Sequence, residues 1–267
     1  MDTRDLPAPP PAAIDRTAVR VVAHRGSSAA EPEHTLAAYR RAIEEGADAL
    51  ECDVRLTADG QLVCVHDRTV RRTSDGTGVV STMTLAQLEK LDFGSWKTGS
   101  GPQPVLTLAQ LLELAADAGR RVELAIETKH PVRHAGQLEA ELLKMLGHYG
   151  LLPTDQESSQ IRIMSFSERA VRRVRQAAPQ VPTVYLLERR LPLRGRIRNL
   201  PGGAPIAGPG IDLVRADPGL VTALRAAGHR VHVWTVDEPA DVELCLELGV
   251  EAIITNRPRE VLTQLGR

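Results

Sequence analysis

Short apolar runs rich in β-branched residues alternate with longer amphipathic segments along most of this chain. The alternation predicts parallel strands joined by crossover helices, and eight such strands predict a (β/α)₈ TIM barrel, an α/β fold that usually takes about 250 residues. An open doubly wound sheet is the alternative, but no GxGxxG follows any predicted strand. The predicted strands are residues 19–24, 48–54, 121–127, 161–166, 182–187, 211–214, 230–236 and 252–255, and the clearest helices are residues 35–46, 107–119 and 167–178.

A ninth apolar run, residues 61–67, is joined to the second predicted strand by the short turn of residues 57–60. That connection is too short for a parallel crossover, and its Asp59-Gly60 pair favours a hairpin turn. We therefore expect an antiparallel arm on the second strand. Residues 68–104 then lie outside the barrel repeat and predict a small insertion over one end of the barrel. Thr-x-x-Gln strings that begin at Thr84 and Thr107 predict two helix starts closed by capping boxes.

The length of 267 residues fits a single barrel domain over residues 19–267. Residues 1–18 carry acids and prolines where a secretory signal has a basic start and an apolar stretch, so we expect a flexible leader and a cytoplasmic protein. With 33 Lys and Arg against 34 Asp and Glu, the formal net charge of −1 gives no field for binding nucleic acid. No apolar run approaches the roughly 20 residues that span a bilayer, so we expect no membrane insertion.

The three cysteines, Cys52, Cys64 and Cys245, cannot all pair and match no zinc spacing. Cys64 is expected on the face of the arm that carries His66, and Cys52 on the opposite face of its strand. We therefore expect no disulfide between Cys52 and Cys64.

Three acidic residues occur where strands of the predicted barrel end. Glu51 and Asp53 lie two residues apart on the second strand and so share one face, and Glu127 and Lys129 repeat this spacing on the third. We expect all four side chains to converge, because barrel active sites form at strand ends. Carboxylates this close need a cation, and an all-oxygen set selects a hard one. The residues predict one divalent cation, Mg²⁺ or Ca²⁺, unless the acids lie on a solvated strand face.

Two histidines end apolar runs at the same rim. His24 and Arg25 end the first strand, and His66 ends the hairpin arm, where we expect it opposite or near Glu51. Two imidazoles beside a dication suit acid/base catalysis, in which one takes a proton from the nucleophile and the other protonates the leaving oxygen. Arg25 and Lys129 would neutralise a phosphate, and the charge balance favours a phosphodiester over a neutral sugar.

These residues lie in strings that resemble the glycerophosphodiester phosphodiesterase family, which has a barrel like that of the phosphatidylinositol phospholipases C. The strings are AHRGSSAAEPEHTLAAYRRAIEEGAD, LECDVRLTADGQLVCVHDRTVRRTSDGTG, VLTLAQLLEL, LAIETK, VHVWTVDEP and GVEAIITNRP, and they run in order over residues 20 to about 258. The resemblance implies a divalent metal and hydrolysis of glycerophosphodiesters, such as glycerophosphocholine, to sn-glycerol 3-phosphate and an alcohol. By motif position it implies acid/base roles for His24 and His66, metal binding by Glu51, Asp53 and Glu127, phosphate contacts from Arg25 and Lys129, and Trp234 in the substrate pocket.

Two positions depart from the family's pattern. His34 stands where the family usually has Asn, and Asn256 stands where an Asp commonly follows the last strand. Because His34 precedes Thr35, a good helix N-cap, we expect it to have a structural role, and we expect the departures to affect the rim and the alcohol preference. Glu33, in the same motif, either reaches the site or packs at the helix start.

The residues leave several questions open. A lysophospholipase D-type phosphodiesterase is an alternative function, and so is a barrel that binds phosphodiesters or metal without turnover. The alcohol head group, the choice between water and the glycerol hydroxyl as nucleophile, and the oligomeric state are not determined by the sequence.

Overall fold

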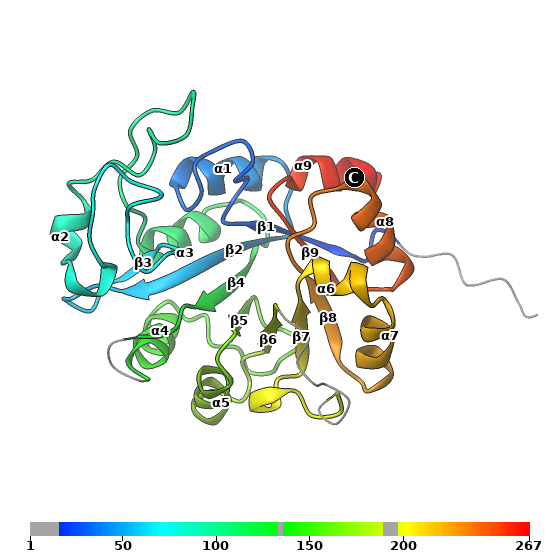
Figure 1. The fold of residues 1–267 in the computed structure, drawn as a ribbon. Coiled ribbons are helices and arrows are strands. Elements are labelled where there is room, and N and C mark those ends of the chain that lie inside the picture. The colour runs from blue at the N-terminus through cyan, green and yellow to red at the C-terminus, as the bar shows by residue number, and fades with distance from the viewer. Residues whose placement is uncertain (1–15, 133–135, 189–196) are drawn as a thin grey trace, which may run out of the picture.

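Eight parallel strands close into a barrel, as the sequence predicts. The structure, a computed structural model, describes residues 16–132, 136–188 and 197–267. Within these residues β1 pairs with both β2 and β9, so the ring of parallel strands returns to its start, and helices surround it (Figure 1). The strands are β1 Arg20–His24, β2 Ala49–Leu56, β3 Leu62–Cys64, β4 Glu123–Thr128, β5 Ile161–Ser165, β6 Thr183–Leu187, β7 Ile206–Pro209, β8 Arg230–Val233 and β9 Ala252–Thr255.

The helices include the three that the sequence marks most clearly, now bounded as α1, α3 and α5. Thr35 caps α1, and capping boxes at Thr84 and Thr107 begin α2 and α3, as expected. The helices are α1 Leu36–Glu44, η1 Val80–Thr82, α2 Leu85–Leu88, α3 Leu108–Ala116, α4 Gln137–His148, α5 Glu168–Ala177, η3 Pro201–Gly203, α6 Ile211–Ala216, α7 Gly219–Ala226, α8 Pro239–Glu247 and α9 Pro258–Gln264. Among the described residues, no helix combines the length and the apolar character needed to cross a bilayer.

The barrel wall divides the side chains of β2 between two environments. Leu50, Cys52 and Val54 point outward and join the apolar layer between the strands and the surrounding helices. Since neighbouring residues of a strand point to opposite faces, Glu51 and Asp53 face the barrel interior. The apolar packing inside the ring comes from small and medium side chains of the strands, namely Val22, Ala49, Ala125, Met164, Val184, Leu186, Ile206, Ala252 and Ile254.

The seventh strand is the one predicted strand that was wrong. Residues 211–214 belong to helix α6, and the strand is the preceding run of residues 206–209. Gly208 keeps that strand close to β6, because a Cβ there would lie 2.7 Å from a methyl group of Leu186. Residues 211–214 start a helix after Gly210, with Leu213 and Val214 buried and Asp212 polar. The four residues of β7 include a Gly and a Pro, which hid the strand from a search for β-branched runs.

The hairpin arm is confirmed, but the faces of its cysteines were wrongly assigned. β3 pairs antiparallel with β2, and Cys64 lies across from Val54. Cross-strand partners share a face, so Cys64 lies on the same face as Val54 and Cys52, in one apolar cluster. All three cysteines are nevertheless free and buried, as expected. The absence of a disulfide therefore does not arise from opposite faces.

Residues 68–104 contain η1 and α2 and lie beyond the end of the β2–β3 arm, at the left of Figure 1. Val70, Val80, Leu88 and Phe93 of this segment pack with the arm in an apolar cluster of their own. Lys97 Nζ donates a hydrogen bond of 2.7 Å to the carbonyl oxygen of Ser28, which follows β1. The segment is therefore attached to the loop between β1 and α1.

Most of the expected leader, residues 1–15, lies outside the described residues. Arg16, just after it, makes an ion pair of 2.7 Å with Glu243 on α8.

Candidate active site

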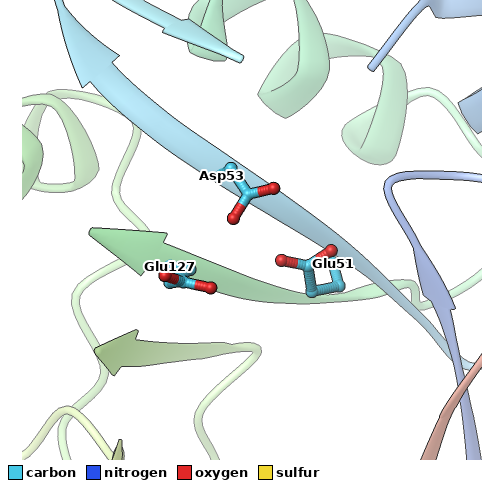
Figure 2. Close-up of side chains that lie close together, drawn as sticks. All are labelled: Glu51, Asp53 and Glu127. Atoms are coloured by element: carbon cyan, nitrogen blue, oxygen red, sulfur yellow. The ribbon is translucent and has the colours of Figure 1, made fainter. Parts of the chain in front are cut away.

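Three buried carboxylates meet at the C-terminal ends of two neighbouring strands. Glu51 and Asp53 come from β2 and Glu127 from β4, and Asp53 is the register partner of Glu127. One oxygen from each residue can be chosen so that all three lie within 4.8 Å of one another. Figure 2 shows the three carboxylates turned toward a common space. The predicted convergence is therefore present.

Two cationic side chains border the acids. Arg25 Nε lies 3.1 Å from Asp53 Oδ2, and the Arg25 backbone N–H donates a hydrogen bond of 3.0 Å to Glu51 Oε2. Lys129 Nζ lies 2.8 Å from Glu127 Oε1 and 3.3 Å from Asp53 Oδ1. Both predicted phosphate contacts thus lie at the acidic cluster.

The pKa values of the three acids indicate that the cluster holds too little positive charge to keep all of them ionised. Burial and the neighbouring Asp53 charge raise the pKa of Glu51 well above its ordinary value, and the same two causes raise the pKa of Glu127 to about 8. Burial alone would raise the pKa of Asp53, but the His34 hydrogen bond and the Lys129 charge outweigh burial and lower this pKa. Arg25 and Lys129 therefore do not supply enough charge to ionise all three acids. An all-oxygen donor set of this kind fits a hard divalent cation, Mg²⁺ or Ca²⁺.

His24 ends β1 and is held through an amide. Its Nδ1 lies 2.7 Å from Asn256 Oδ1, and Asn256 Nδ2 donates a hydrogen bond of 2.6 Å to Asp237 Oδ2. Burial, and to a smaller extent the Arg25 charge, lower the pKa of His24 to about 4. The ring is therefore neutral at pH 7. Because the Asn256 amide nitrogen donates to Asp237, its amide oxygen accepts from Nδ1 of His24. Nε2 of His24 is then left as the acceptor nitrogen of the ring.

His66 follows the hairpin arm and is held through a carboxylate. Its Nδ1 lies 2.6 Å from Asp67 Oδ1, and Arg55 donates two hydrogen bonds, of 3.1 and 2.7 Å, to its carbonyl oxygen. The sequence predicts His66 opposite or near Glu51. The Val65 N–H bonds to the carbonyl oxygen of Asp53, so His66 follows one residue beyond the partner of Asp53. Burial lowers the pKa of His66, while the Asp53 charge opposes this shift, which places the ring in electrostatic range of the cluster.

His34 has a closer relation to the site than the sequence predicts. Its Nε2 lies 2.9 Å from Asp53 Oδ2 and its Nδ1 lies 2.8 Å from the Tyr39 hydroxyl, which donates to the carbonyl oxygen of Glu51. This residue is buried beside a candidate ligand instead of at the rim, and Asn256 is likewise bonded to His24. Both departures from the family's pattern thus fall on residues that orient site groups, which a motif comparison alone does not reveal.

An aromatic wall lies beside Lys129. Trp234, after β8, meets the ring of Phe166 edge to face at 5.5 Å between centroids, and its Nε1 donates to the carbonyl oxygen of Gly208 at 2.7 Å. Lys129 Nζ lies 5.9 Å from the centroid of Phe166. Phe166 follows β5 and is one of the exposed large apolar side chains. Trp234 therefore lies at the same end of the barrel as the acids, together with Phe166, whose position after a strand is its only signal in the sequence.

Comparison with known proteins agrees with this geometry. The model of the glycerophosphoryl diester phosphodiesterase family matches residues 24–260. The chain belongs to this family. It is 48% identical over 245 residues to the probable glycerophosphodiester phosphodiesterase 1 of Mycobacterium tuberculosis, with 89% of each chain covered. It is 34% identical over 249 residues to the glycerophosphodiester phosphodiesterase of Bacillus subtilis, covering 90% of this chain and 84% of the relative.

A solved structure similar to this family member is that of an Oleispira antarctica phosphodiesterase in complex with the product sn-glycerol-3-phosphate. It superimposes with a TM-score of 0.84 at 25% identity, over 94% of this chain and 98% of the other. The barrel therefore agrees with a solved phosphodiesterase over nearly its whole length.

Proposed function

We propose that this protein is a metal-dependent glycerophosphodiester phosphodiesterase that releases sn-glycerol 3-phosphate and an alcohol with His24 and His66 as its acid/base pair. The observation that carries the proposal is the meeting of Glu51, Asp53 and Glu127, with His24 paired to Glu51 from β1 and His66 following the arm that pairs with β2. Family membership and the product bound to the Oleispira relative support the substrate class.

Glu51, Asp53 and Glu127 would hold one divalent cation, Mg²⁺ or Ca²⁺. When bound, such an ion withdraws electron density from a phosphate oxygen and offsets the charge that develops there. Arg25 and Lys129 add two positive charges next to the same acids, so the residues together favour a phosphodiester anion. Trp234 and Phe166 offer an apolar wall for the carbon atoms of the substrate beside Lys129.

The different partners of the two histidines support different roles for them. His24 has a neutral amide as its partner, and its Nε2, for which no hydrogen bond occurs among the described residues, suits removal of a proton from the attacking oxygen of water or of the glycerol hydroxyl group. If the glycerol hydroxyl attacks, water then opens the resulting cyclic phosphate to give sn-glycerol 3-phosphate. His66 has the Asp67 carboxylate as its partner, which opposes the lowering of the His66 pKa by burial and supports a role in proton donation to the leaving oxygen. The oxygen–phosphorus bond to the attacking oxygen forms as the bond to the leaving alcohol breaks. Each proton transfer thus has a stated donor or acceptor in this chain.

The same proposal treats residues 19–267 as one catalytic domain with an insertion at 68–104 and places the protein in the cytoplasm. The neighbouring free thiols Cys52 and Cys64 support a reducing compartment, where thiols are kept unpaired.

The proposal is tested by glycerol 3-phosphate release from glycerophosphocholine, glycerophosphoethanolamine and glycerophosphoserine, after chelation and again after addition of Mg²⁺, Ca²⁺ or Mn²⁺. We expect loss of turnover on chelation and recovery with at least one ion. His24→Ala and His66→Ala should each lower kcat by about 10²–10⁴-fold while metal affinity stays the same. His148→Ala, which changes an exposed histidine at the end of α4, is the control and should be active. Turnover that survives complete chelation would contradict the proposal.

The roles of the histidines can be separated with a glycerophosphodiester whose leaving group is p-nitrophenolate, because that group leaves without being protonated. His66→Ala should lose much less activity on this substrate than on glycerophosphocholine, whereas His24→Ala should lose similar activity on both. The reverse pattern would exchange the two roles.

A further inference from the structure

Arg72, in the 68–104 segment, joins two loops of the candidate site. Its Nη1 and Nη2 lie 2.6 and 2.8 Å from the two oxygens of Glu33, which belongs to the loop after β1. Its Nε donates a hydrogen bond of 2.8 Å to Asp67 Oδ2, and Asp67 is the partner of His66. One guanidinium therefore binds carboxylates from two different segments, the loop after β1 and the segment after β3.

Each of these carboxylates has a second partner nearer to the reaction centre. Glu33 Oε1 lies 2.9 Å from Nη1 of Arg25, and Arg25 in turn lies beside Asp53. Asp67 Oδ1 lies 2.6 Å from Nδ1 of His66. The contacts therefore run without a break from His66 through Asp67, Arg72 and Glu33 to Arg25.

The backbone around Arg72 is well fixed. Val70 is fully buried, its N–H donates to the carbonyl oxygen of Gly78, and its carbonyl oxygen accepts from the Thr73 N–H and the Ser74 hydroxyl. The side chain of Arg72 is itself 44% exposed, so its ion pairs alone add little to the stability of the fold. A planar guanidinium that contacts two carboxylates is better suited to fixing their geometry.

The adjacent Arg71 provides a comparison within the chain. It is exposed and carries the same charge, yet no hydrogen bond or ion pair of its side chain occurs among the described residues. Arg72 also affects the protonation of Glu33 and Asp67. Burial would raise the pKa of each, but hydrogen bonds from Arg72, together with Arg25 at Glu33 and His66 at Asp67, outweigh it, and the pKa of both carboxyls falls to about 2.

We propose that Arg72 is a positioning residue of the reaction, which acts through Asp67 to fix the ring of His66 and through Glu33 to fix the guanidinium of Arg25. This inference rests on the proposed function. Among the described residues, the hydrogen bonds and ion pairs of the Arg72 side chain go to Glu33 and Asp67 and not to the candidate metal ligands, so we expect it to act through these two carboxylates. The 68–104 segment thereby contributes to proton donation although it lies outside the barrel.

The substitution Arg72→Ala has a calculable direction of effect on His66. The charged groups around that ring are Asp53, Arg25 and Lys129 from the barrel and Asp67 beside it, and Arg55 binds its carbonyl oxygen. Loss of Arg72 leaves the negative charge of Asp67 less compensated, so the protonated ring is stabilised and the pKa of His66 rises. In the pH profile of kcat/KM, the basic limb, where the general acid loses its proton, should then move to higher pH.

The test compares Arg72→Ala, Arg72→Lys and the control Arg71→Ala. Arg72→Ala should lower kcat on glycerophosphocholine by about 10–100-fold, a loss usual for groups that orient a catalytic side chain, and Arg72→Lys should lose less. Arg71→Ala should stay within about twofold of the wild type. Metal affinity, measured by calorimetry, should be unchanged in all three variants. In an Asp67→Ala background the Arg72→Ala substitution should cost less than it does in the wild type, since only the contact through Glu33 to Arg25 is then left to lose.

NMR titration of the His66 ring, assigned by comparison with His66→Gln, tests the inference without turnover. The pKa of His66 should rise in Arg72→Ala and change less in Arg71→Ala. Equal kinetics and titration for Arg72→Ala and Arg71→Ala would overturn the inference, and so would a loss of metal affinity as large as the loss of kcat. If the wild type hydrolyses no glycerophosphodiester, the proposed function fails, whereas the titration still decides whether Arg72 acts on His66.

Discussion

Metal binding by the acidic cluster should depend steeply on pH because of Glu127. Burial and the Asp53 charge raise the pKa of its carboxyl group to about 8, although Lys129 lies only 2.8 Å away. A cation binds the ionised carboxylate, so this proton has to leave when the metal enters. The perturbations that test this are a change of pH and the substitution Glu127→Gln, which keeps the shape and removes the titration.

The size of the effect follows from the pKa. With a pKa of about 8, the carboxyl group is ionised in about 1% of molecules at pH 6, about 9% at pH 7 and about 50% at pH 8. The apparent affinity should therefore rise about tenfold between pH 6 and pH 7, which corresponds to about 1.4 kcal/mol, and about fivefold more by pH 8. Glu51, whose pKa is also raised, changes affinity in the same direction.

Isothermal titration calorimetry of the metal-free protein with Ca²⁺ or Mg²⁺ measures this directly. Repeating the titration at pH 7 in buffers of different ionisation enthalpy should give a release of about 0.9 proton from Glu127 alone. In Glu127→Gln the affinity should be lower and its pH dependence weaker. An affinity that is flat between pH 6 and pH 8 in the wild type would refute the reasoning, because it would mean that Glu127 is already ionised without metal.

The same proton affects the free energy of unfolding of the metal-free protein. The folded state binds the Glu127 proton more tightly than the unfolded state, whose carboxyl has its ordinary pKa of 4.5, so stability falls as pH rises from 4.5 through 8. His24 opposes this at lower pH, since its pKa falls from 6.5 to about 4 and stability rises with pH across that interval. The window from pH 6.5 to 8 therefore isolates the acids, and saturating metal should abolish the decline there.

Two further substitutions test particular contacts. Asn256→Asp would place a carboxylate at Nδ1 of His24, so the pKa of His24 should rise. The acidic limb of the pH profile of kcat/KM should then move to higher pH. An acidic limb that does not move would show that His24 does not determine it. Gly26→Ala should cost about 2–4 kcal/mol in chemical denaturation, because its φ is +86° and a Cβ would lie 2.6 Å from the Ala38 carbonyl carbon. The control Gly60→Ala, with a similar φ of +81° and no atom within 4 Å of the added Cβ, should cost about 1 kcal/mol, and equal losses would contradict the steric explanation.

The barrel could be predicted from the sequence because parallel strands buried on both faces read as continuous apolar runs. Seven of the eight runs are strands for this reason, and the hairpin arm was marked by Asp59-Gly60. The seventh strand could not be found in this way, because close packing on Leu186 requires a glycine at position 208. A position where space excludes a side chain carries no hydrophobic signal of its own.

The candidate ligands could also be predicted, since a spacing of two on one strand fixes a shared face. The groups that orient the site could not. His34 reaches Asp53 with a backbone φ of +59°, and Asn256 reaches His24 across 232 residues of sequence. Neither contact follows from a periodic pattern. Arg72 and Arg71 are likewise indistinguishable as adjacent arginines, and only the turn fixed by Val70 places one of them between Glu33 and Asp67.

The two proposed acid/base residues are held by different parts of the molecule. His24 is fixed from within the barrel, by its own strand and by Asn256 after β9. His66 follows an arm that extends past the barrel, and its partner Asp67 is bound by Arg72 of the 68–104 segment. The strand ladder that aligns Asp53 with Glu127 is complete without that segment. The barrel alone therefore positions the candidate metal ligands and the proposed general base, whereas the proposed general acid is positioned through Asp67, which Arg72 of the 68–104 segment binds.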